Sequence, residues 1–404
     1  MLKTIVKKNN YQDSINLMLL TNEVNALQGV TKSSVMMGTD ANKDIFEGSG
    51  LLTEEAKAAS AADMVIVLDV VDEKVVDQAL ATIDHFLSDL TVKREKSGVT
   101  NATSLKQSLE LLPEANLALF SIPGEYAADE MMKALEAGLS VFSFTDNVAL
   151  EDEVRLKNYA HENGLLMMGP DCGTGIISGI PLAFTNVVKP GNIGIVGASG
   201  TGIQEVSTII DRLGGGVVHA IGTGGRDLSE AVGATTVKDA LVALDHYDPT
   251  DVIVLISKPP APAVRDEVVS LLHNLSKPVV AVFIGEKPDH HEQGVYLAHT
   301  LEETARIALD LANNRSVKPN YVGALDNEVN DVLSSSATVK GLYSGGTLGS
   351  EAAMLISEAL QLGKIIHSEG YVLHTHGYEV VDYGDDMYTQ GRPHPMIDPA
   401  TRIE

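Results

Sequence analysis

Short apolar runs recur along the chain and are separated by glycine-bearing turns and amphipathic segments. This alternation is typical of α/β domains with parallel sheets. The runs that predict strands are 64–71, 117–122, 141–144, 165–168, 193–196, 217–221, 252–256 and 278–284. We therefore predict the α/β class, with several Rossmann-like or flavodoxin-like parallel-sheet domains in series.

Helical patterns fill the spaces between these runs. Val76, Leu80 and Ile83 share one helical face, and Asp72 precedes them as a cap. A second helix is predicted over 201–213, where a glycine triplet stops it. Polar or proline- and glycine-bearing segments at 92–103, 189–192 and 312–326 indicate the joints between domains.

Composition narrows the classes of partner. The 404 residues hold 29 Lys+Arg against 55 Asp+Glu, a formal charge of −26, and 44% are apolar. Such an acidic surface repels polyanions, so nucleic acid and anionic membrane surfaces are not expected as partners. No apolar stretch is long enough to span a membrane. Cys172 is the single cysteine, which excludes an internal disulfide, and we expect a cytoplasmic protein.

Two turns are candidate anion sites because small residues there open a helix. After the strand at 193–196 come Ser199, Gly200, Thr201 and Gly202, with Glu205 in the first turns of the helix. Ser344, Gly345, Gly346 and Thr347 repeat this opening. Free N–H groups at a helix start favour phosphate or carboxylate. The alternative is that the glycines serve packing alone.

Further loops follow predicted strands, at the edge where open α/β sheets bind ligands. Their candidate contact residues for a substrate or a CoA-like ligand are Gly124, Asn147, Pro170, Asp171, Cys172, Gly224 and Gly225. Arg226 either clamps a substrate carboxylate or is a solvated loop residue. For Cys172 we favour a packed, inert thiol over a nucleophile.

The remaining candidates are histidines and the C-terminal loop. His290 and His291 are adjacent on a polar loop, which lacks the spacing of a helical metal pair. Arg392 and His394 lie in a loop fixed by proline and glycine, and are candidate catalytic residues with Glu205 and Arg226. We predict no metal site.

These residues together resemble the FdrA family, which are acyl-CoA synthetase-like proteins related to the α subunit of succinyl-CoA synthetase. The resemblance covers essentially the whole chain, and its motifs are long. They are Val35-Met-Met-Gly-Thr-Asp-Ala-Asn-Lys43, Gly169-Pro-Asp-Cys-Gly-Thr174, Gly197-Ala-Ser-Gly-Thr-Gly-Ile-Gln-Glu205, Ser257-Lys-Pro-Pro260 and Gly391-Arg-Pro-His-Pro-Met-Ile-Asp398; shorter matches are Gln12-Asp-Ser14 and Gly124-Glu-Tyr-Ala127.

The resemblance implies four domains. They are a small N-terminal α/β domain at 1–104, a CoA-binding-like Rossmann domain at 105–188, a succinyl-CoA-synthetase-like flavodoxin-like domain at 189–316 and a partial second ligase-type α/β domain at 337–404. It also implies that Ser199, Gly200 and Thr201 face a phosphorylated intermediate and that Glu205 contacts an active histidine. The chain departs from the synthetases after Gly285, where their Gly-His-Ala-Gly segment is replaced by Glu-Lys-Pro-Asp-His-His.

This departure favours direct attack by bound phosphate, without a covalent phosphohistidine. Our leading hypothesis is therefore an oxamate carbamoyltransferase subunit of purine and allantoin breakdown, which converts oxalurate and phosphate into oxamate and carbamoyl phosphate. The first alternative is an ATP-dependent carboxylate–CoA ligase that uses His290 or His291. The second is a non-catalytic ligand-binding subunit.

The resemblance also sets the expected ligands and partners. Phosphate is a substrate, together with a small carboxylate or ureido compound, whereas CoA and ATP stay open as cofactors. We expect an oligomer and further protein subunits.

Overall fold

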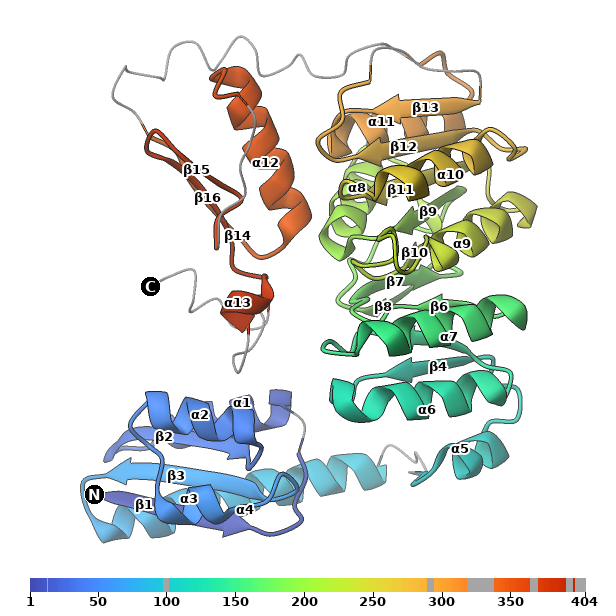
Figure 1. Cartoon of the computed structure of the whole chain (residues 1–404). Helices are drawn as coiled ribbons and strands as arrows, with labels where there is room; N and C mark the ends of the chain where they lie inside the picture. Colours follow the sequence, from blue (N-terminus) through green and yellow to red (C-terminus); the bar gives the residue numbers. More distant parts are fainter. Residues whose placement is uncertain are drawn as a thin grey trace. The chain divides into compact units, whose positions relative to one another are not determined.

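The computed structural model of the chain describes residues 1–12, 14–96, 102–288, 294–317, 338–363, 370–389 and 395–396. It divides into two compact units. The first unit is Met1–Ala102 with Asp386–Asp398, and the second is Thr103–Asp385 with Pro399–Glu404. Figure 1 follows the chain from blue at the N-terminus to red at the C-terminus.

The first unit is built on a small antiparallel sheet. Its strand order is β1 (Leu2–Lys7), β3 (Met64–Val70) and β2 (Val30–Met37), and β3 is antiparallel to both neighbours. The helices of this unit are α1 (Ser14–Asn25), α2 (Asp40–Gly48), α3 (Glu54–Ala58), α4 (Glu73–Lys96) and α13 (Asp386–Thr389). Asp72 caps α4 as predicted, because its carboxylate accepts the Lys74 amide at 2.8 Å.

The parallel pairing that the rhythm of apolar runs predicts is wrong for this unit, because both of its strand pairs are antiparallel. Only β3, whose residues are buried on both faces, has a continuous apolar run. Lysines interrupt β1, and the polar residues Thr31, Lys32, Ser33 and Ser34 fill half of β2, so neither strand is evident from apolar runs.

The second unit begins with a small parallel sheet. Strands β4 (Leu117–Phe120), β5 (Ser140–Ser143) and β6 (Met167–Met168) lie in that order, all parallel. They alternate with α5 (Leu105–Leu111), α6 (Gly124–Glu136) and α7 (Leu150–Glu162). Phe142 and Met168 of this sheet belong to the same core cluster as Val196 and Ile221 of the next sheet, so the two sheets share a core.

Within the described residues the next sheet, here called the large sheet, has seven strands in the order β13-β12-β11-β9-β10-β7-β8 (Figure 1). The five from β13 to β10 are parallel, and the β7–β8 hairpin adds antiparallel strands at one edge. The bounds are β7 (Thr174–Ile177), β8 (Ile180–Ala183), β9 (Ile193–Gly197), β10 (Val217–Gly222), β11 (Val252–Ser257), β12 (Val279–Phe283) and β13 (Val295–Ala298).

Helices cover both faces of the large sheet. On one face α8 (Gly200–Arg212) and α11 (Leu301–Ala312) share a core cluster with the strands. On the other face α9 (Thr235–His246) and α10 (Pro262–Leu272) do the same. Because β9, β11 and β12 are buried along their whole length, their sequences are unbroken apolar runs.

The second unit ends in a small mixed sheet. Its order is β14 (Lys340–Tyr343), β16 (Tyr378–Asp382) and β15 (Leu373–Thr375), with β14 parallel and β15 antiparallel to β16. Helix α12 (Gly346–Ala359) follows β14 and packs on this sheet.

The α/β class and every predicted strand are confirmed, each strand within two residues at its ends. Helix α8 ends before Gly214 as predicted, and that glycine has a φ of +90°. The joint expected at 92–103 begins inside α4, which continues to Lys96, and 97–101 lie outside the described residues. Residues 318–326 of the third joint also lie outside them.

Candidate functional site

The start of α8 is a tight turn after β9. Ser199 is its N-cap, and the Ser199 hydroxyl accepts a hydrogen bond from the Gly202 amide at 3.0 Å. A Cβ atom on Gly197 would lie 2.6 Å from Ile203 Cγ1, and one on Gly202 would lie 2.8 Å from Ile256 Cγ2. These two glycines therefore serve packing, and that packing places the first amides of α8 at the carboxyl edge of the large sheet.

The start of α12 lies directly against the start of α8. The hydroxyls of Ser199 and Thr347 are hydrogen-bonded to each other, and both side chains are buried. A Cβ atom on Gly345 would overlap the Thr201 side chain. Gly345 is the N-cap of α12 and supplies no side-chain acceptor for its first amides. The two turns predicted separately are therefore brought together in one place.

A lysine that the sequence analysis did not select completes this place. Lys258 follows β11, and its Nζ would lie 2.6 Å from a Cβ atom on Gly346. Asp382 Oδ2 would lie 2.8 Å from the same atom. Among the described residues Lys258 makes no ion pair within 4.0 Å. A cation thus stands at the positive end of a helix, where negative charge, that of Asp382 or of a bound anion, is needed to offset it.

Asp382 is the acidic neighbour of this lysine. Burial raises the pKa of its carboxyl group, while a hydrogen bond from the Gly384 amide at 2.9 Å and the charge of Lys258 oppose that rise. The sequence did hold a signal for Lys258 as a site residue. It follows the strand predicted at 252–256, and the carboxyl ends of parallel strands meet at one edge of a sheet, where ligands bind.

Two glutamates stand close together on the facing helices. Glu351 of α12 accepts a hydrogen bond from the Leu301 amide at 2.7 Å. Burial raises the pKa of Glu351, and the negative charge of Glu205 on α8 raises it further. Glu205 was selected from the sequence, whereas Glu351, in the matching place after the second turn, was not. Farther along α12, Glu358 accepts from His299 Nε2 at 3.1 Å.

The loops at the carboxyl edges of the two parallel sheets pack against one another. A Cβ atom on Gly124 would overlap the Asn147 carbonyl, and one on Gly224 would overlap the Pro170 carbonyl. The Asp171 amide donates to the Thr145 carbonyl at 2.9 Å. The predicted contact residues are thus gathered into one group of loops: Gly124, Asn147, Pro170, Asp171, Cys172, Gly224 and Gly225.

Cys172 is part of the core beneath these loops. Its side chain is buried, and a Cβ atom on Gly222 would overlap its Sγ. Burial raises the pKa of the thiol to about 12. The thiolate is the nucleophilic form, so this geometry favours the packed, inert thiol.

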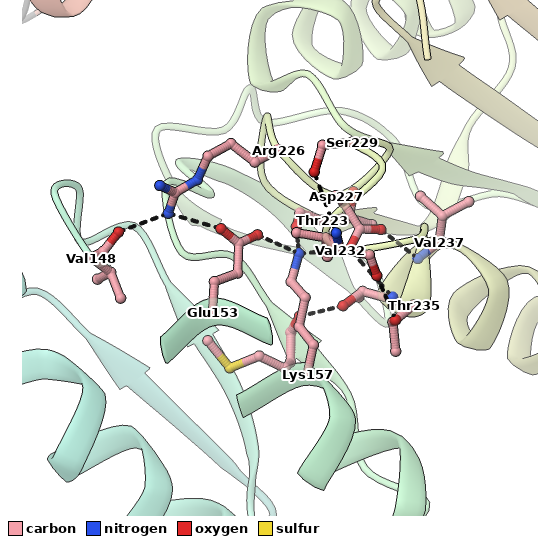
Figure 2. A network of polar contacts seen from close by, with 12 residues as sticks. Val148, Glu153, Lys157, Thr223, Arg226, Asp227, Ser229, Val232, Thr235 and Val237 are labelled. Atoms are coloured by element: carbon pink, nitrogen blue, oxygen red, sulfur yellow. Dashed lines mark hydrogen bonds and ion pairs between the residues drawn. The ribbon is translucent and has the colours of Figure 1, made fainter. Parts of the chain in front are cut away.

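Arg226 is engaged with protein groups in the structure (Figure 2). Its Nη2 lies 2.8 Å from Glu153 Oε2 and donates to the Val148 carbonyl at 2.9 Å. Glu153 Oε1 lies 2.8 Å from Lys157 Nζ, and this lysine lies 2.6 Å from Asp227 Oδ1. In this structure Arg226 thus joins the loop after β10 to α7, and its role as a substrate clamp stays a prediction.

The candidates Arg392 and His394, and the loop histidines His290 and His291, lie outside the described residues. Within the described ranges no cluster of three His, Cys, Asp or Glu side chains has the arrangement of a metal site. No described helix is long and apolar enough to cross a membrane.

The large sheet with helices on both faces defines an α/β protein, and comparison with known families shows that it is of CoA-ligase type. Three family models match the chain. The model described as "AllF, heavy metal-associated domain" matches residues 1–104, "CoA binding domain" matches 188–285, and "CoA-ligase" matches 342–404. The CoA-binding match lies on the large sheet, whereas the resemblance implied a CoA-binding-like domain at 105–188.

Individual proteins are similar to the chain over different shares of its length. YahF of Escherichia coli strain K12, an uncharacterized protein, is 40% identical over 99% of this chain and 80% of its own length. The succinate–CoA ligase subunit alpha 2 of Archaeoglobus fulgidus is 30% identical over 47% of this chain and 66% of its own length. ATP citrate lyase of Methanothrix soehngenii matches in structure with a TM-score of 0.45 and 16% identity, over 55% of this chain and 42% of the lyase.

The chain belongs to the FdrA family of acyl-CoA synthetase-like proteins. Its class is therefore that of CoA-ligase-like, enzyme-related proteins.

Proposed function

We propose that this chain catalyses acyl transfer through an acyl phosphate, in the manner of carboxylate–CoA ligases, with the phosphoryl group bound where α8 and α12 begin. One observation carries the proposal: two helix starts meet there, tied by Ser199 and Thr347, and Lys258 adds a cation without an ion-pair partner among the described residues. The CoA-ligase and CoA-binding matches support the same chemistry.

Electrostatics explain why an anion would bind at this point of an acidic protein. The overall charge of −26 opposes any approaching anion. Each helix start contributes about half a positive charge, and its first amides point outward as donors. Two such starts and one ammonium therefore supply roughly two positive charges, from which the neighbouring Asp382 subtracts when it is ionised.

In the ligase reaction the γ-phosphoryl group of ATP passes to a carboxylate oxygen and ADP leaves. The transfer is direct, or a side chain takes the phosphoryl group first and then gives it to the carboxylate. The thiol of CoA then attacks the carbonyl carbon of the acyl phosphate, the C–O bond breaks, and inorganic phosphate leaves. The helix amides and Lys258 would hold the phosphoryl oxygens in both steps, where negative charge develops.

Carbamoyl transfer is the second candidate, and the sequence after Gly285 favours it. The Gly-His-Ala-Gly segment of the synthetases is absent there. In this reaction an oxygen of inorganic phosphate attacks the carbamoyl carbon of oxalurate. The C–N bond breaks, the phosphate proton passes to the leaving nitrogen, and oxamate and carbamoyl phosphate form. The same anion site would bind the phosphate.

The test begins with binding to the full chain, alone and with candidate partner subunits. Inorganic phosphate should raise the free energy of unfolding, by about 2.7 kcal/mol at a concentration one hundred times its Kd. Acid-labile label from ATP would identify the ligase route through a phosphohistidine. Phosphate-dependent formation of oxamate from oxalurate would identify carbamoyl transfer.

Two N-cap variants separate binding from stability. Ser199→Ala and Ser104→Ala each remove an N-cap hydroxyl, from α8 and from α5. Only Ser199 lies at the proposed site, so only its loss should weaken phosphate binding. If inorganic phosphate does not bind the wild-type chain, or if both variants weaken binding equally, the proposed site is wrong.

A further inference from the structure

A buried lysine lies behind the loop group described above. The side chains of Lys157 and Glu153, both on α7, are 0% and 1% exposed, and Asp227 is fully buried. The Lys157 ammonium donates hydrogen bonds to Asp227 Oδ1 at 2.6 Å and to the Thr223 carbonyl at 2.8 Å, and it forms an ion pair with Glu153 Oε1 at 2.8 Å (Figure 2). The cation is therefore fully enclosed by the protein.

The charges of this network balance. Lys157 and Arg226 are positive, and Glu153 and Asp227 are negative. Asp227 also accepts the amides of Thr236 and Val237 at the start of α9. A buried ion pair is weak evidence for added stability, because packed apolar residues of similar volume do as well or better. Its fixed geometry therefore calls for another explanation.

The backbone of Thr223 connects Lys157 to the proposed phosphate site. Thr223 follows β10, and its amide donates to the Gly197 carbonyl at 2.9 Å. Gly197 is the last residue of β9, two residues before the N-cap Ser199. The carbonyl of Thr223 thus bonds to the Lys157 ammonium, and the amide of Thr223 bonds to the turn that begins α8.

The opposite flank of this turn is held by the sheet itself. The Ala198 amide donates to the Ile256 carbonyl of β11 at 3.0 Å. Lys157 is accordingly the side chain that fixes the β10 flank, whereas the backbone of β11 fixes the other. Through Glu153 and Arg226 the same network reaches the Val148 carbonyl, beside Asn147 of the loop group.

We propose that Lys157 is a positioning residue for the phosphate site: it holds the Thr223 carbonyl, and Thr223 in turn holds the turn of Gly197 to Ser199 in register with the start of α12. This proposal rests on the proposed function for the identity of the ligand. Its structural part, that Lys157 sets the rigidity of the turn, stands independently of the reaction.

The test uses a variant that removes the tether and keeps the charges balanced. Lys157→Met with Asp227→Asn deletes one positive and one negative charge and leaves Glu153 paired with Arg226. The new amide oxygen at position 227 remains an acceptor for the Val237 amide. The single change Lys157→Met would instead leave two buried carboxylates with one cation, and unfolding would then obscure the result.

Two readouts follow from the proposal. Hydrogen exchange of the peptide covering 197–205 should become at least about tenfold faster, while exchange of 252–257 stays unchanged. The Kd for inorganic phosphate, measured by calorimetry on the full chain, should rise by about tenfold or more, since small misplacements of binding groups are costly.

The matched control removes a polar contact that joins α7 to α9, in place of the one that joins α7 to the loop after β10. His161 Nδ1 of α7 and Asp239 Oδ1 of α9 are 2.8 Å apart. His161→Gln with Asp239→Asn should leave both readouts within twofold of wild type. Unchanged exchange at 197–205 in the Lys157 variant overturns the proposal. If wild type binds no phosphate but exchange at 197–205 still accelerates, the proposed function fails and the positioning role stands.

Discussion

Lys258→Met tests whether the cation at the start of α12 serves binding or stability. Lys258 is exposed and has no ion pair within 4.0 Å among the described residues, so its removal breaks no salt bridge there and loses only its attraction for Asp382. Removing a cation from a helix start gains about 0.3–1 kcal/mol. Losing its attraction for Asp382 costs about 0–1 kcal/mol. We therefore expect the free energy of unfolding without ligand to change by less than about 1 kcal/mol.

The effect on ligand binding should be much larger. A hydrogen bond to a charged group contributes about 1.5–3 kcal/mol. At 1.4 kcal/mol for each factor of ten, the Kd for inorganic phosphate should rise by about 10-fold to 150-fold. Calorimetry gives the Kd, and urea unfolding with and without phosphate gives the stability.

The control is Lys238→Met, which removes a lysine from α9 on the other face of the large sheet. Its phosphate affinity should equal that of wild type. A Lys258 variant that binds phosphate as tightly as wild type, or that loses more than about 2 kcal/mol of stability without ligand, would refute this reasoning.

Three further outcomes are expected. The Cys172 thiol, with its pKa raised to about 12, should react with a disulfide reagent at about pH 8 roughly a thousandfold more slowly in the folded than in the urea-unfolded chain. Glu351→Gln should stabilise the protein at about pH 7 and leave its stability unchanged near pH 4 in urea titrations. The folded-state pKa of Glu351 lies above its ordinary value of 4.5, so the folded chain holds this proton more tightly, and that stability is lost as the pH rises through the folded-state pKa. Ser199→Ala should cost about 1 kcal/mol in the same assay, the value of one N-cap; a change near zero would show that Thr347 and water replace the cap.

The parallel strands could be predicted from sequence because burial on both faces leaves an unbroken apolar run. This holds for β9, β11 and β12. It fails for β1 and β2, which flank β3 in the antiparallel sheet and carry lysines and polar residues. Pairing direction is set by contacts between distant segments, which periodicity does not encode.

The candidate site was predictable only in parts. Both turns were found, because Ser199 to Gly202 and Ser344 to Thr347 repeat one local pattern. Their meeting was not, because it depends on how α12 packs against α8 across 145 intervening positions between Ser199 and Gly345. Lys258 was missed although its place directly after a strand was a signal, whereas Lys157 had no such signal. A lysine has no local sequence signal that distinguishes a buried tether from a solvated side chain.

The hydrogen bond between Ser199 and Thr347 joins two helices of the same chain, so the contact between these helices does not depend on protein concentration. Where two subunits each bring one helix, the meeting point is lost below their dissociation constant. Here the two starts are covalently linked, so each sees the other at an effective concentration that does not depend on how much protein is present. Phosphate binding per chain should therefore be the same at nanomolar as at micromolar protein.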